Sequence, residues 1–134
     1  MVLSEHNKMK KEIMDFIKSK YGYYFPKSTS MPLGCSRNTR IYSTDIVVLK
    51  DNNIKYIIEP ESSTGGTPIC GKIVLANKSI EKMVKTGLQS PNVKPKLIFL
   101  YKPDFPKNEL ERVKYRVNEA EIQTNFLQDV FIDY

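Results

Sequence analysis

Hydrophobic residues recur along this chain with two periods, one typical of helices and one typical of strands. From Ser4 to Lys20 they recur every three or four positions, which predicts an amphipathic helix. A second helix is predicted to open with Thr67 as its N-cap and Pro68 at its first position, and to end near Gly87. A third runs from Lys107 to about Gln123. The residues expected on the inner faces of these helices are Met9, Ile13, Phe16 and Ile17, then Ile69, Ile73, Ala76, Ile80 and Val84, then Leu110, Val113, Val117 and Ala120.

Shorter apolar runs bounded by turn residues predict the strands of a buried sheet. These runs are residues 23–26, 41–50, 54–61, 96–101 and 126–134. Asp51-Asn52-Asn53 separates the second run from the third and predicts a tight turn, so the two form a β-hairpin. Residues 27–40 (KSTSMPLGCSRNTR) have no period and are predicted to be a long loop, a kind of segment that often carries function.

These elements predict an α/β fold with a mixed central sheet that contains a β-hairpin and is flanked by helices. Their order along the chain is α-β-β-β-α-β-α-β. The hairpin connects to the 96–101 strand through a helix, so those two strands should be parallel and their crossover right-handed. A length of 134 residues fits one domain, 1–134.

Charge and composition narrow the class of partner. The chain has 21 Lys and Arg against 15 Asp and Glu, a net charge of +6, which favours a polyanion such as DNA or RNA. One histidine and two cysteines without metal-ligand spacing argue against a zinc site and against a histidine-activated nucleophile. No apolar stretch is long enough to cross a bilayer, and the charged N-terminus does not resemble a signal peptide, so we expect no membrane partner and a cytoplasmic location.

Three carboxylates are predicted to meet at one end of the hairpin. Glu59 and Glu61 are two positions apart on one strand and therefore project from the same face. With the turn near Asn52, residues whose numbers sum to about 104 stand opposite each other, which brings Asp45 to Glu59. Such a cluster of hard oxygen ligands predicts a site for Mg²⁺, or Mn²⁺ or Ca²⁺. A register slip of one residue would send both glutamates to the other face.

The segment STDIVVLKDNNIKYIIEPES, followed by a helix, resembles the core of the PD-(D/E)xK nuclease superfamily, which includes type II restriction endonucleases and archaeal Holliday-junction resolvases. The resemblance covers roughly residues 4–101. It implies a restriction-endonuclease-like core and metal-dependent hydrolysis of phosphodiester bonds in DNA, with Asp45 and Glu59 as Mg²⁺ ligands. Glu61 stands at the usual lysine position, as in some restriction enzymes, and would ligate the metal or help activate the water. Pro60 departs from the pattern, because proline cannot donate to the sheet ladder.

Further candidates flank this cluster. Lys72, on the side of the second helix, could approach the carboxylates and replace the missing lysine, or could be an ordinary solvated lysine. The resemblance implies a helical glutamate at the metal, for which Glu12 is the candidate, and a surface glutamate is the equal alternative. Residues suited to contact phosphate, as side chains in the loop before Asp45 or in the turn that feeds a helix N-terminus, are Lys27, Arg37, Arg40, Ser62 and Ser63.

The resemblance also implies a homodimer, because one subunit covers only one strand of a duplex. The apolar tail with Phe131, Ile132 and Tyr134 suits a two-fold interface or an ordinary edge strand. Two other functions stay open. One is a non-catalytic module with a nuclease-like fold that binds nucleic acid or protein. The other is a general α/β domain whose acidic residues lie on its surface.

Overall fold

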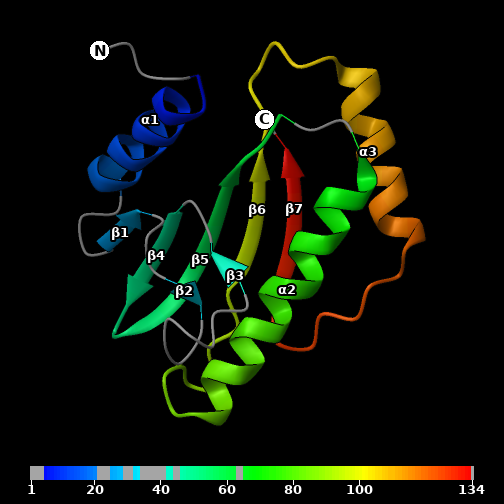
Figure 1. The fold of residues 1–134 in the computed structure, drawn as a ribbon. Coiled ribbons are helices and arrows are strands. Elements are labelled where there is room, and N and C mark those ends of the chain that lie inside the picture. The colour runs from blue at the N-terminus through cyan, green and yellow to red at the C-terminus, as the bar shows by residue number, and fades with distance from the viewer. Residues whose placement is uncertain are drawn as a thin grey trace.

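A computed structural model of the chain describes residues 5–20, 25–28, 32–33, 42–43, 46–62 and 65–133. Its elements follow in the order α1 (Glu5–Lys20), β1 (Phe25–Ser28), β2 (Pro32–Leu33), β3 (Tyr42–Ser43), β4 (Ile46–Lys50), β5 (Asn53–Pro60), α2 (Gly66–Lys85), β6 (Lys96–Leu100), α3 (Lys107–Glu119) and β7 (Asp129–Asp133). Strands β4 to β7 lie side by side, and α2 and α3 both pack on one face of the sheet (Figure 1). The predicted α/β class is confirmed.

The main sheet is mixed and has the strand order β1-β4-β5-β6-β7. Strands β1, β4 and β5 pair antiparallel, whereas β5, β6 and β7 pair parallel. The predicted parallel pair joined through the second helix is therefore confirmed. A short antiparallel pair, β2–β3, was not predicted. Strand β3 lies inside the predicted strand 41–50, which is thereby divided into β3 and β4, and β2 and the end of β1 lie inside the predicted loop 27–40. The pair was not predicted because two-residue strands are too short to produce a period in the sequence.

The β4–β5 hairpin has the predicted turn. Asp51 and Asn52 have φ angles of 53° and 63°, and two consecutive positive φ angles are the mark of a type I′ turn. The ladder then shifts by one residue between Val48 and Leu49. Beyond this bulge the register is Val48↔Tyr56, Val47↔Ile57 and Ile46↔Ile58. These pairs sum to 104, so the register that the sequence predicted is the one observed away from the turn.

A buried glutamine fixes the start of β5. The Gln89 side chain is 2% exposed, and its Oε1 accepts a hydrogen bond from the Ile54 N–H at 2.8 Å. Its Nε2 donates to the carbonyls of Ile54 and Val93, at 3.1 and 2.9 Å. This one side chain therefore satisfies three backbone groups and ties the segment after α2 to the hairpin.

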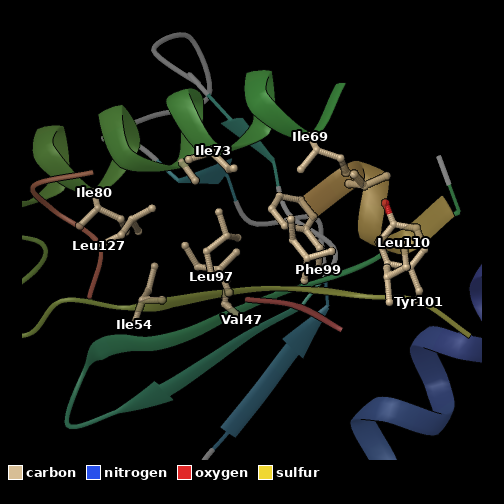
Figure 2. Packing of buried hydrophobic residues seen from close by; sticks show 14 residues of the cluster. Val47, Ile54, Ile69, Ile73, Ile80, Leu97, Phe99, Tyr101, Leu110 and Leu127 are labelled. Carbon is tan, nitrogen blue, oxygen red and sulfur yellow. The ribbon is translucent and has the colours of Figure 1, made fainter. Parts of the chain in front are cut away.

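Alternation along the strands gives the sheet two apolar faces. The larger cluster joins Val47, Ile57, Leu97 and Phe99 to the inner residues of α2 and α3 (Figure 2). The smaller one, on the opposite face, contains Ile46, Val48 and Ile58, with Ile13 of α1 packed against it. Each fully buried aliphatic side chain contributes about 1.5–3 kcal/mol, so the sheet is held chiefly from the α2–α3 side.

The ends of α2 were predicted in part. The helix begins at Gly66 with Gly65 as its N-cap, so Thr67 is not the cap and Pro68 stands third rather than first. The proline is tolerated there because the N–H groups of the first turn have no helical acceptor. The predicted end is confirmed, since Thr86 is the C-cap and Gly87 has a φ of 80°. The predicted inner residues Ile69, Ile73, Ala76 and Ile80 are buried, and Val84 is partly buried.

The other two helices depart more from the pattern. In α1, Ile13 packs inward but Phe16 is 58% exposed, so its predicted inward position is wrong. Helix α3 ends at Glu119 rather than near Gln123, because Glu121 takes a positive φ of 47° and ends the helical conformation. Ala120 is consequently exposed. In the part of the chain that the structure describes, no helix is long and apolar enough to span a membrane.

Candidate active site

The two glutamates of the predicted cluster lie at the carboxyl end of β5. Glu59 is 3% exposed and pairs in the parallel ladder with Phe99. Ile57 of the same strand belongs to the cluster under α2 and α3, so alternation puts Glu59 and Glu61 on that face as well. A buried carboxylate at the end of a central strand is uncommon, since charged groups are rarely fully buried.

Pro60 fits this position because the strand ends there. The Glu61 N–H donates to the carbonyl of Leu100 on β6 at 2.9 Å, so the preceding nitrogen, which alternates in direction, points to the β4 side. On that side the described ladder stops at Ile46↔Ile58. The proline therefore removes no hydrogen bond from the β5–β6 pair, and β5 ends at this residue, one position before the predicted end at residue 61.

The structure brings Lys72 of α2 against Glu61. The Lys72 Nζ donates to Glu61 Oε2 at 2.7 Å, and the two side chains are 35% and 8% exposed. The other carboxylate oxygen, Oε1, accepts from the Ser62 N–H at 3.0 Å. Both oxygens of Glu61 thus have donors, and an ammonium group from a helix stands beside the end of β5 (charge-assisted hydrogen bonds of this kind are the stronger ones).

Tyr101 adds a buried phenol that the sequence interpretation missed. It directly follows β6, is 1% exposed and packs its ring against Phe105 with 4.6 Å between centroids. Burial raises the pKa of Tyr101, and the negative charge of Glu61 raises this pKa further, so the phenol stays protonated beside that carboxylate. The available signal was its place at the carboxyl end of a parallel strand, where functional residues collect.

The remaining candidates are spread more widely. Glu12 is exposed on α1, where it lines a hollow with Met9, Leu100, Tyr101 and Asp104 at the end of β6. Ser62 is exposed and meets Glu61 through its backbone. Lys27 pairs its backbone with Val47 in edge strand β1. Lying outside the described residues are Asp45, Arg37, Arg40 and Ser63.

The described acids alone do not form a metal centre. Over 5–20, 25–28, 32–33, 42–43, 46–62 and 65–133, no three His, Cys, Asp or Glu side chains are grouped so that they could hold an ion. Glu12, Glu59 and Glu61 therefore do not make a three-ligand site by themselves, and Asp45, the predicted first ligand, lies outside the described residues. The tail prediction is similarly incomplete. Phe131 is 42% exposed on edge strand β7 and Ile132 is buried, whereas Tyr134 is outside the described part.

Comparison with known proteins adds no family. No protein-family model matches the chain, and no curated protein matches it significantly. The likeness to PD-(D/E)xK nucleases therefore depends on the chain's own residues and on the order of its elements. It stays a prediction.

Proposed function

We propose that the chain is a metal-dependent nuclease that hydrolyses phosphodiester bonds in DNA. The observation that carries the proposal is the Lys72–Glu61 ion pair beside buried Glu59. In the PD-(D/E)xK pattern a lysine follows the second acid by two positions, and this chain has Glu61 there. An ammonium group from α2, held by that same glutamate, supplies the missing positive charge at the end of β5.

The hairpin register supports the first acid of this site. The pair Ile46↔Ile58 ends the described ladder, and the next residues in each direction along the chain are Asp45 and Glu59. Continuation of the register by one position would set these two acids opposite each other, about 5 Å apart between Cβ atoms. Two carboxylates at that spacing repel each other unless a cation compensates them.

The donor set fits Mg²⁺. Asp45 and Glu59 would hold the ion through hard carboxylate oxygens, with Glu12 as a candidate additional ligand and Mn²⁺ as a substitute metal. A bound Mg²⁺ would polarise a phosphodiester oxygen and make a bound water more acidic. Glu61 has both oxygens engaged by Lys72 and Ser62, so it orients the lysine rather than binding the ion. The Lys72 ammonium would then hold a phosphate oxygen or the attacking water, as a compact point charge with three donors.

Phosphate contacts beside this centre would come from the segment before β4 and the segment after β5. Lys27, Arg37 and Arg40 supply positive charge, and Ser62 and Ser63 supply hydroxyl donors near the N-terminus of α2. The first turn of α2 contains no acidic residue, so the partial positive charge of the helix end is not offset there. These features favour a polyanionic substrate.

A non-catalytic nucleic-acid- or protein-binding module with the same fold is the alternative. The observation that favours it is that both carboxylate oxygens of Glu61 already accept hydrogen bonds, from Lys72 and from the Ser62 N–H. Glu61 is then not a metal ligand, and only Asp45 and Glu59 remain as the principal ligands. A module of this kind would bind DNA with a steep dependence on salt, yet cleave nothing.

A plasmid-nicking assay separates the two functions. Purified protein is incubated with supercoiled plasmid in Mg²⁺, in Mn²⁺ and in EDTA, beside Asp45→Ala, Glu59→Ala and the surface control Glu81→Ala. The nuclease predicts metal-dependent nicking that both site variants lose and the control keeps. Plasmid that stays supercoiled in every metal, while gel shifts show binding, would establish the module and refute the enzyme.

A further inference from the structure

The outer face of α3 carries two arginines around an exposed tyrosine. Asn108, Arg112, Tyr115 and Arg116, here called the α3 stripe, stand at positions i, i+4, i+7 and i+8 and share one side of the helix. The other side buries Leu110 and Val113 in the core. All four stripe residues are exposed, and Tyr115 is the most exposed of the large hydrophobic side chains among the described residues, at 65%. Packing therefore does not explain the tyrosine.

The guanidinium groups of the two arginines, Arg112 and Arg116, have no ion-pair partner among the described residues. The nearest acid in sequence, Glu111, lies 3.6 Å from Lys114. On α2, by contrast, Lys78 and Lys85 both bind Glu81, at 3.2 and 2.9 Å. The guanidinium groups of the stripe thus remain available to an external anion.

Close packing joins the stripe to the start of α2. A Cβ atom added to Gly66 would lie 3.0 Å from Arg116 Cβ and 3.1 Å from its Cδ, so the arginine stem covers this glycine and a larger residue would displace it. Gly66 follows Glu61 by five positions and begins the helix that supplies Lys72. Helices α2 and α3 are close together at that end and diverge farther along α2 (Figure 1). The Arg116 end of the stripe therefore lies against the start of the helix that supplies Lys72.

We propose that the α3 stripe binds a single-stranded segment of the nucleic acid whose cleavage is proposed above, so this inference rests on that function. Arg112 and Arg116 are one helical turn apart, about 6 Å along the axis, and would hold neighbouring phosphates. Tyr115 lies between them along the helix axis and would stack on a base. Stacking on a side chain requires a base that is not already stacked in a duplex. The substrate class is therefore DNA with an unpaired segment, such as a single-stranded end or flap. The stripe borders an open hollow of about 470 Å³, which leaves room for the base.

Fluorescence anisotropy tests the stripe directly. A fluorescein-labelled single-stranded 20-mer and a blunt duplex of the same sequence are titrated in EDTA, where a metal-dependent nuclease cannot cleave. Arg112→Gln/Arg116→Gln removes both charges and keeps part of the stem that covers Gly66. Lys78→Gln/Lys85→Gln removes two positive charges from α2 as the matched control, and circular dichroism verifies that each variant is folded. Tyr115→Phe keeps the stacking ring that Tyr115→Ala removes.

The expected results separate stacking from charge. The arginine double variant should raise the Kd for the single strand about tenfold or more and should reduce the slope of log K against log salt by about 1–2. The lysine double variant should change both the Kd and this slope less than half as much. Tyr115→Ala should weaken single-strand binding at least about fivefold while Tyr115→Phe retains it, and the duplex should be affected less. Equal effects of the arginine and lysine double variants, or a Tyr115→Ala variant that binds like wild type, would refute single-strand binding by the α3 stripe, even if the protein nicks plasmid. Stripe-dependent binding without nicking would instead refute only the nuclease.

Discussion

The ion pair between Glu61 and Lys72 should be energetically stronger than the more exposed ion pairs along α2 and α3. Its Nζ–Oε2 distance is 2.7 Å and the Glu61 side chain is only 8% exposed, so the carboxylate is largely withdrawn from water. Hydrogen bonds to charged groups contribute about 1.5–3 kcal/mol. Because Lys72 is 35% exposed and screened by solvent, we expect a coupling in the lower part of this range, about 1.5–2 kcal/mol.

A double-mutant cycle measures this coupling. Glu61→Gln, Lys72→Met and the double variant preserve side-chain shape, and urea unfolding gives the free energy of each. The same cycle on Glu81 and Lys85, at 2.9 Å and with side chains 20% and 69% exposed, is the control and should yield about 0.3–0.5 kcal/mol. A Glu61–Lys72 coupling no larger than the control would refute the claim that the lysine is held at the site by this glutamate.

Three further predictions concern the frame around the site. Gln89→Leu leaves three backbone groups without their hydrogen bonds and should lower the free energy of unfolding by about 2–4 kcal/mol in urea melts, and a loss below about 1 kcal/mol would contradict its role. Ile73→Ala, in the core at 1% exposure, should cost about 2–5 kcal/mol, whereas Val74→Ala beside it, at 50% exposure, should change stability by less than about 0.5 kcal/mol. Burial, and then the charge of Glu61, raise the pKa of Tyr101, so the folded state keeps this proton at a pH where the unfolded state loses it. The resulting stability is complete below the ordinary tyrosine pKa of 10.0 and is lost as pH rises above it. Tyr101→Phe should therefore flatten the fall of Tm above pH 10. If the variant and the wild type lose Tm equally as pH rises above 10, this role of Tyr101 is disproved.

The fold was predictable where a period is long enough to read. Ile69, Ile73, Ala76 and Ile80 recur at helical spacing and are all buried, and the Asp51-Asn52 turn fixed the hairpin. Phe16 has the same spacing but is exposed, because periodicity gives a face and not the area of sheet available to cover it. The β2–β3 pair was missed because two-residue strands are too short to show a period, although residues 42–43 lie inside the predicted strand 41–50.

The placement of Glu59 and Glu61 in the candidate site was predictable, and that of the residues around them was less so. Alternation and turn position gave Glu59, Glu61 and a register whose residue numbers sum to 104. The approach of Lys72 to Glu61 was one of two interpretations, because the rotation of a helix over a sheet depends on packing. Tyr101 was not found, although the predicted parallel pairing of β5 with β6 already put it at the carboxyl end of a strand, because its burial and its closeness to Glu61 depend on tertiary packing.

The rate of DNA cleavage by Glu59→Gln tests the central claim most directly. The substitution keeps the shape of a side chain that is 3% exposed and removes only its charge, and Glu81→Gln removes an exposed charge as the control. With excess enzyme on supercoiled plasmid in Mg²⁺, we predict that Glu59→Gln cleaves at least about 100-fold more slowly than wild type, and that Glu81→Gln cleaves at the wild-type rate. Cleavage by Glu59→Gln within about twofold of wild type would contradict the assignment of this carboxylate to a metal-dependent active site.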